Sequence, residues 1–220
     1  MKIVAAGDSF TYGEELSNLE HAYPYILSNL LPGDNSVINL AEPAGSNDKI
    51  VRKLTEYLLG NTADLVVIGW TSPGRMEFAD EKGTFDIWPG YGGNLFSFDG
   101  LEFRNVLNKY FSSYHDKKFL YKRYLQNIIL IQSLLKIKNI KYVMMDVVAR
   151  EFYKNQYYLG EFSMFHSEID KYCFIEYNTG SMAEWVGNSP KGPRGHFLEQ
   201  GHELVANRIY EHIRHLGWVS

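Results

Sequence analysis

The fold of this chain is decided near its start by the stretch Ile3-Val-Ala-Ala-Gly-Asp-Ser-Phe-Thr-Tyr-Gly13, in which an apolar run ends abruptly in small and polar residues. An apolar run of this length, bounded by a turn signal, predicts a buried strand over residues 2–6. Open α/β sheets bind ligands beyond the carboxyl ends of their strands. Ser9 directly follows such a strand, so its hydroxyl is the first candidate nucleophile.

The rest of the chain alternates between apolar runs and segments with helical period. This alternation predicts an α/β fold with a mostly parallel central sheet. The further strands are expected at 36–41, 64–70 and 141–148. The helices are expected at about 21–31, 47–59, 118–138 and 199–216.

Length and composition predict one domain, residues 1–220, and exclude several classes of protein. With 22 basic and 26 acidic residues, the net charge of −4 gives no cationic face for nucleic acid. The N-terminus lacks the features of a secretory signal, and the apolar run 128–131 is too short for a membrane span. We therefore expect a cytoplasmic protein without nucleic-acid or membrane partners. The single cysteine, Cys173, is interpreted as a buried, inert thiol.

Two aromatic-rich insertions, at about 71–117 and 149–172, interrupt the pattern. A long connection in a compact domain is typically a functional lid or binding loop. The alternative is that both insertions pack against the core or against another subunit. Trp88, Tyr91 and Trp185 can stack on sugar faces, although core packing is the more usual role of such residues. In the second insertion, an aromatic wall is suggested by Tyr153, Tyr157, Tyr158, Phe162 and Phe165.

A serine nucleophile needs a base within hydrogen-bond reach and donors for the developing oxyanion. Of the seven histidines, His196 is the best candidate base, because it follows the loop 189–195 and immediately precedes the last predicted helix. The histidines and acids show no metal-ligand spacing, and no glycine loop suited to phosphate lies between a strand and a helix. We therefore expect no metal and no cofactor.

Three motifs in order along the chain carry a family resemblance. They are Gly7-Asp-Ser9 with Gly13, Asn39-Leu-Ala-Glu-Pro-Ala-Gly-Ser46, and His196-Phe-Leu-Glu-Gln-Gly-His202. Together they resemble the first, second and last blocks of the SGNH/GDSL hydrolases. The resemblance spans nearly the whole chain. It implies a flavodoxin-like, three-layer α/β/α sandwich, with Ser9 as nucleophile and His196 as general base.

The same resemblance implies an oxyanion hole formed by the amides of Ser9 and Gly45. The family's third block, Gly-x-Asn-Asp, aligns with residues 69–72, so its asparagine is absent here. A hydroxyl of Thr71 or Ser72 can donate in its place. Asn47 is a further candidate donor, with an N-cap or loop role as the alternative.

The family's triad acid stands three residues before the histidine, where this chain has Pro193. Other acids, Glu199, Glu77 and Asp48, each have simpler helix-capping or surface roles. We therefore expect a serine–histidine dyad. A backbone carbonyl can orient the ring of His196 in such a dyad, but the sequence leaves the orienting group open. Without a full negative charge beside the imidazole, turnover is expected to be slower or its pH optimum higher.

Three residues near the predicted strand ends have alternative roles. Trp70 and Arg75, at and after the strand 64–70, are candidate substrate-binding residues. Arg75 is suited to an anionic or polyhydroxy substrate, the alternative being a salt bridge with Glu77. Asp8 is expected to accept backbone amides in its turn rather than to take part in the chemistry.

The sequence thus predicts a serine esterase that cleaves an acyl ester of a small molecule or glycan through an acyl-enzyme. Two alternatives stay open. One is a binding or assembly module on a hydrolase scaffold with weakened catalysis. The other is an acyltransferase, in which a hydroxyl rather than water accepts the acyl group.

Overall fold

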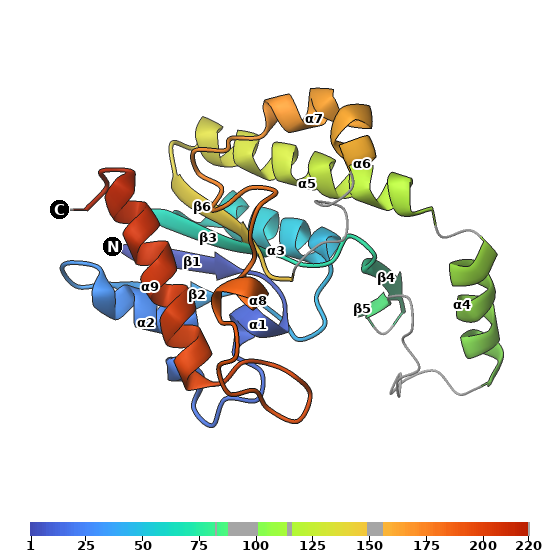
Figure 1. Ribbon diagram of the computed structural model, residues 1–220, viewed down its shortest axis with the longest axis horizontal. Coiled ribbons are helices and arrows are strands. Elements are labelled where there is room, and N and C mark those ends of the chain that lie inside the picture. Colours follow the sequence, from blue (N-terminus) through green and yellow to red (C-terminus); the bar gives the residue numbers. More distant parts are fainter. Residues whose placement is uncertain (82, 88–100, 114–115, 149–155, 220) are drawn as a thin grey trace.

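The computed structural model describes residues 1–81, 83–87, 101–113, 116–148 and 156–219. Its centre is a parallel four-stranded sheet in the order β2-β1-β3-β6. Figure 1 shows the four strands side by side between two groups of helices. The strands are β1 (Lys2–Ala6), β2 (Ser36–Asn39), β3 (Leu65–Trp70) and β6 (Lys141–Asp146). The predicted α/β class is confirmed.

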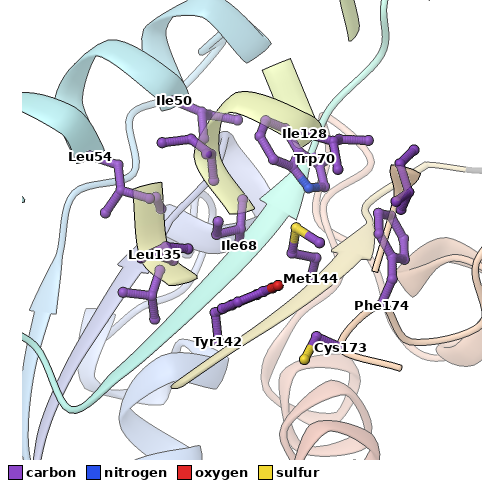
Figure 2. Packing of buried hydrophobic residues seen from close by; sticks show 14 of the residues in the cluster. Ile50, Leu54, Ile68, Trp70, Ile128, Leu135, Tyr142, Met144, Cys173 and Phe174 are labelled. Atoms are coloured by element: carbon purple, nitrogen blue, oxygen red, sulfur yellow. The ribbon is translucent and has the colours of Figure 1, made fainter. Parts of the chain in front are cut away.

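Helices cover both faces of the sheet because successive strand residues point to opposite sides. On one face, Val4 and Ile68 pack with residues of α3 (Asn47–Gly60) and α5 (Lys117–Ile137). On the other, Ile3 and Val67 pack with α2 (Tyr23–Leu30), α8 (Met182–Trp185) and α9 (Glu199–His215). Figure 2 shows the first of these clusters between β3, β6 and the overlying helices. The three layers agree with the expected α/β/α sandwich.

The first predicted insertion contains a hairpin and a helix. The hairpin consists of the antiparallel strands β4 (Met76–Asp80) and β5 (Gly83–Ile87). Two ion pairs join it to α3, Lys49 to Asp86 at 2.5 Å and Arg52 to Glu77 at 2.6 Å. The hairpin is followed by α4 (Leu101–Ser113), which Figure 1 shows well apart from the sheet. Trp88 lies outside the described residues, as does Tyr91.

The second insertion contributes α6 (Gln156–Glu161) and α7 (Ser163–Glu168). Phe162, between them, is buried against Tyr121 of α5, with the rings edge to face at 5.6 Å. The part of the expected aromatic wall that includes Phe162 is therefore core packing. Tyr153 and the side chains of Tyr157 and Tyr158 lie outside the described part.

Within the described ranges, none of the helices combines the length and the apolar character that a membrane span needs. Cys173 is buried as predicted, and burial raises the pKa of its thiol to about 11. A thiol with so high a pKa is almost entirely protonated near neutral pH and is a poor nucleophile.

Candidate active site

Ser9 stands at the carboxyl edge of the sheet because β1 ends at Ala6 and a one-turn helix, α1 (Ser9–Tyr12), begins at once. Asp8 is the N-cap of α1, and its Oδ1 accepts a hydrogen bond from the Phe10 N–H at 3.0 Å. The turn ends at Gly13, whose φ of 92° lies in the left-handed region that favours glycine. Ser9 therefore projects from a short, rigid corner.

His196 reaches Ser9 from the other end of the chain. Its loop is closed by the Gly192 N–H, which donates to the His196 carbonyl at 2.8 Å. The neighbouring Phe197 is buried in the core and anchors the loop. The imidazole packs on Phe10, with ring centroids 4.8 Å apart, and its Nε2 lies 2.9 Å from Ser9 Oγ. The structure brings the two predicted residues together.

Glu15, which the sequence analysis did not single out, lies beside His196 Nδ1, the ring nitrogen that does not contact Ser9. Its Oε2 lies 2.8 Å from His196 Nδ1 and accepts the His196 N–H at 3.1 Å, while Oε1 accepts the Arg194 N–H at 2.9 Å. The carboxylate therefore holds both the ring and the backbone of its loop. The orienting group that the sequence left open is thus a carboxylate, and the expected dyad without an acid at His196 is corrected.

Backbone geometry explains how an acid so close to Ser9 reaches the far side of the imidazole. Gly13 and Glu15 both have positive φ, 92° and 73°, and these two reversals turn the chain back toward the loop of His196. Glu15 is a non-glycine residue in the left-handed region. This backbone conformation is strained for residues with a side chain, and it persists only when surrounding contacts stabilise it. The three hydrogen bonds accepted by its carboxylate hold it there.

The Glu15 carboxylate stays ionised in this setting. Desolvation raises its pKa, but hydrogen bonds from the Arg194 N–H and from His196 outweigh that effect, so the pKa of Glu15 is lowered from its ordinary value. An ionised acid at Nδ1 fixes the imidazole tautomer that presents Nε2 to the serine and stabilises the imidazolium when it forms.

On the oxyanion side, Gly45 lies against the backbone that precedes Ser9. A Cβ at this position would stand 3.5 Å from the Gly7 carbonyl oxygen and 3.8 Å from Asp8 Cα. However, the Gly45 N–H donates to the Glu42 carbonyl at 3.1 Å. The close approach of Gly45 to the backbone before Ser9 agrees with the oxyanion position that the family resemblance implies. Its N–H, the expected oxyanion donor, is instead bound within a turn of its own loop.

Asn47 and Thr71 bind each other through two hydrogen bonds. The Asn47 side chain accepts from the Thr71 N–H and donates to the Thr71 carbonyl, both at 3.0 Å. The Thr71 hydroxyl donates to Asp8 Oδ2 at 2.6 Å. Ser72 Oγ accepts the Gly74 N–H at 3.3 Å. These contacts give Asn47 a loop role, its amide has a second N–H beyond the one bound to Thr71, and the N-cap of α3 is Ser46.

Arg75 lies next to these groups. Its Nη1 donates to the Gly45 carbonyl at 3.3 Å and stands 3.4 Å from Asp8 Oδ2. The alternative partner expected from the sequence, Glu77, is paired with Arg52 instead. The guanidinium thus contacts the Gly45 backbone and the Asp8 side chain, which lie on either side of the expected oxyanion position. Asp8, fully buried, accepts the Phe10 amide as expected.

Trp70 does not face the site, and the prediction that it binds substrate is wrong. Its side chain is fully buried, edge to face with Tyr124 of α5 at 6.1 Å. Figure 2 shows it beside Ile128 in the core. Strand alternation places Trp70 on the same side of β3 as Ile68, beneath α5. Trp70 is therefore inaccessible to a substrate although it is the last residue of β3.

The three acids considered from the sequence all lie in other contacts. Asp48 pairs with Arg123, Glu77 with Arg52, and Glu199 accepts from the Ser17 hydroxyl at 3.2 Å. The part of the chain that the structure describes contains no group of three or more His, Cys, Asp or Glu residues that can hold a metal ion. The site is therefore best described by its serine, histidine and glutamate.

Solved structures share this fold over nearly the whole chain. A G-D-S-L family protein from Desulfitobacterium hafniense DCB-2 is 15% identical, with a TM-score of 0.54, and the match covers 96% of this chain and 98% of that one. The psychrotrophic esterase EstA from Pseudoalteromonas sp. is 13% identical, with 98% and 97% covered and a TM-score of 0.58. A family two carbohydrate esterase from Clostridium thermocellum, in complex with cellohexaose, is 16% identical, with 99% and 65% covered and a TM-score of 0.54.

These likenesses establish an SGNH-like α/β fold. A search of curated protein sequences gives no match. A family model, described as a family of unknown function (DUF6071), matches residues 11–220. This chain is therefore a member of the DUF6071 family, with the fold of the SGNH/GDSL esterases.

Proposed function

We propose that this protein is a serine esterase that cleaves an acyl ester through a Ser9 acyl-enzyme. The observation that carries the proposal is the continuous hydrogen-bonded chain from Glu15 through His196 to Ser9, with links of 2.8 and 2.9 Å. A serine hydroxyl, an imidazole and an ionised acid in this order form a catalytic triad, which is recognised by geometry and roles rather than by sequence position.

The geometry supports the following steps. Ser9 Oγ attacks the ester carbonyl while His196 Nε2 takes the hydroxyl proton, and Glu15 stabilises the imidazolium that results. The tetrahedral intermediate collapses as His196 gives the proton to the leaving oxygen, which departs as an alcohol. A water molecule then attacks the acyl-enzyme, again with His196 as base, and releases the carboxylic acid and free Ser9.

Two donors are proposed for the oxyanion. Ser9 is the first residue of α1, so its N–H has no acceptor within the helix. The second proposed donor is Arg75, which follows the segment 69–72 that lacks the family's third-block asparagine and whose guanidinium contacts Gly45 and Asp8. A cation at the developing oxyanion stabilises it more strongly than a neutral amide does. In this assignment, Asp8 and the Gly45 carbonyl position the guanidinium.

The proposed substrate class rests on the structurally similar proteins. EstA is an esterase with a structure inhibited by monoethylphosphonate, and the Clostridium protein is a carbohydrate esterase. By analogy with these proteins, we propose a small-molecule or glycan ester as the substrate. The binding-module alternative is motivated by the missing third-block asparagine, the missing triad acid and the aromatic insertions. Glu15 beside His196 Nδ1 removes the second of these grounds and favours the enzyme.

The proposed function is tested with a fluorophosphonate probe and an aryl ester. We expect one adduct per chain, on the peptide that contains Ser9, together with turnover of p-nitrophenyl acetate. Ser9→Ala should abolish both, and the matched control Ser17→Ala should keep both. Labelling that persists in the Ser9 variant would remove this serine from the mechanism. Product analysis with added alcohols distinguishes hydrolysis from acyl transfer.

The role of Arg75 has its own test. Arg75→Met should lower kcat for p-nitrophenyl acetate by about 10²–10³-fold, the usual effect of removing one oxyanion donor. The exposed Arg214 provides the control Arg214→Met, which should leave kcat unchanged. A fall in the affinity for substrate without a fall in kcat would instead make Arg75 a binding residue.

A further inference from the structure

A second carboxylate faces the catalytic imidazole. Glu14 Oε2 lies 3.6 Å from His196 Nε2, the same ring nitrogen that contacts Ser9 Oγ. Glu15 holds the opposite ring nitrogen, Nδ1, at 2.8 Å. Glu15 is therefore sufficient to orient the ring. Glu14 lies on the other side, next to the nitrogen that transfers the proton, and the triad mechanism gives it no role.

The Glu14 carboxylate is held at the border between the site and the solvent. Its backbone N–H donates to the Ser9 carbonyl at 3.0 Å, which ties it to the nucleophile's own turn. Its Oε1 pairs with Arg194 Nη1 at 2.6 Å. The side chain of Glu14 is 17% exposed and that of Arg194 is 69% exposed. Arg194 thus fixes one carboxylate oxygen from outside, and the other oxygen faces the reacting nitrogen.

The proposed reaction brings the leaving alcohol close to the Glu14 carboxylate. In the proposed reaction, His196 Nε2 donates its proton to the leaving oxygen, so that oxygen lies about 3 Å from Nε2 when the ester breaks. Glu14 Oε2 is close to the same nitrogen. A hydroxyl on the carbon next to the leaving oxygen can therefore point at Glu14. An ionised carboxylate is a strong acceptor for such a hydroxyl.

We propose that Glu14 forms a leaving-group subsite that selects esters of vicinal diols, such as polyols and sugars, by accepting a hydrogen bond from the neighbouring hydroxyl. This inference rests on the proposed esterase function and specifies the alcohol side of its substrate. The negative charge of Glu14 also disfavours leaving groups that carry an anion at this position. Arg194 positions the carboxylate without contacting the reacting atoms.

The inference is tested with two esters that differ only at the neighbouring position, ethylene glycol monoacetate and propyl acetate. A hydrogen bond to a charged group corresponds to about 10–100-fold in kcat/KM, and the wild-type protein should prefer the glycol ester by this factor. Glu14→Ala should bring the ratio close to one. Glu14→Gln, which keeps a neutral acceptor oxygen, should give an intermediate ratio.

The control substrate is p-nitrophenyl acetate, which has no neighbouring hydroxyl, so Glu14→Ala should lower kcat/KM for the glycol ester by about 10–100-fold more than for this aryl ester. The control variant is Glu199→Gln, whose carboxylate accepts from Ser17 rather than facing His196, and it should keep the wild-type ratio. If Glu14→Ala lowered turnover of all three esters equally, Glu14 would act only through the imidazole and the subsite would be refuted. A wild-type ratio near one would also refute it.

A loss that is specific to the glycol ester, relative to the p-nitrophenyl acetate turnover of the same variant, supports the subsite. Absence of any turnover or probe labelling in the wild-type protein would contradict the proposed esterase function itself. The proposed Glu14 subsite would then be contradicted as well. The aryl ester therefore reports on the triad, while the ratio of the two alkyl esters reports on Glu14 alone.

Discussion

At the scale of single residues, the site depends on how one carboxylate is held. Glu15 accepts from the His196 ring and from two backbone N–H groups of the loop 194–196. A side chain that only paired with the ring would be free to rotate away. The two backbone contacts fix the distance between Glu15 and the loop, and so they fix the position of Nε2 relative to Ser9.

This dependence gives a prediction for a residue that touches neither substrate nor serine. A Cβ added at Gly192 would stand 2.6 Å from Glu15 Cδ, so Gly192→Ala must displace the carboxylate. A misplacement of about 1 Å can cost about 10²-fold in rate, and we expect a loss of this order in kcat for p-nitrophenyl acetate.

The matched control for this variant is Gly60→Ala, because a Cβ at Gly60 meets no atom within 4 Å. It should keep full activity. Circular dichroism should show that both variants are folded. If Gly192→Ala retained wild-type kcat, the carboxylate would tolerate displacement and the account of how Glu15 is positioned would be wrong.

At the scale of elements, most of the scaffold could be predicted from the sequence. The strands of a parallel sheet are buried on both faces and read as continuous apolar runs, as Leu65–Trp70 does. Helices such as Asn47–Gly60 show their period because only one side is buried. Both signals are local, and the observed elements lie close to the predicted ranges.

The triad acid could not be predicted in the same way. The contact between Glu15 and His196 joins residues 181 positions apart, through two loops without periodicity. It also depends on a non-glycine residue with positive φ, which residue type alone does not indicate. The hydrogen-bond partner of the Gly45 N–H could not be predicted for a related reason. Gly45 was expected at the right place, but whether its N–H was engaged depended on the turn around it.

The hairpin β4–β5 supports the oxyanion side through one buried acid. Asp86 accepts the Ser46 N–H at 2.9 Å and pairs with Lys49 at 2.5 Å, with only 2% of the Asp86 side chain and 8% of the Lys49 side chain exposed. Asp86 therefore ties the hairpin both to the loop of Gly45 and to the first turn of α3. A buried pair of this kind is costly to break from one side, because a charge is left unpaired.

We therefore expect Asp86→Ala to lower the free energy of unfolding by about 3–5 kcal/mol, measured by urea denaturation. The double variant Lys49→Met, Asp86→Leu should recover much of this loss, since no buried charge is left without its partner. Additive losses in the double variant would show that the pair is not coupled. The more exposed pair of Arg52 with Glu56 provides the control, and Glu56→Ala should change stability by less than about 1 kcal/mol.

At the scale of the whole molecule, the fold closes by bringing the two ends of the chain together. Figure 1 shows α9, near the C-terminus, packed beside α2 on one face of the sheet. His202 lies in this contact, 1% exposed, and its Nδ1 accepts the Tyr23 N–H at 3.2 Å. The same packing brings the loop of His196 to Ser9, so the integrity of the site depends on the docking of α9.

The buried His202 predicts how stability depends on pH. Burial lowers its pKa from 6.5 to about 4, so the folded protein keeps it neutral while the unfolded chain takes up a proton below 6.5. The contribution to stability is therefore complete above pH 6.5, falls as the pH drops, and levels off below about 4. By about pH 5 the loss should be about 2 kcal/mol.

His202→Gln should remove this dependence, so that its free energy of unfolding changes by about 2 kcal/mol less than that of wild type between about pH 7.5 and pH 5. The amide oxygen of glutamine can still accept from the Tyr23 N–H. Urea denaturation at the two pH values measures the difference. An identical pH dependence in the two proteins would mean that His202 is not kept neutral by burial.

The most direct test of the proposed triad is a double-mutant cycle between Glu15 and His196, measured as kcat for p-nitrophenyl acetate. Glu15→Gln alone should lower kcat by about 10³–10⁴-fold, because the acid acts by orienting and stabilising the imidazole. In the His196→Ala background, the same substitution should cost almost nothing. An equal loss in both backgrounds, or no loss in either, would show that Glu15 does not act through His196 and would contradict the triad.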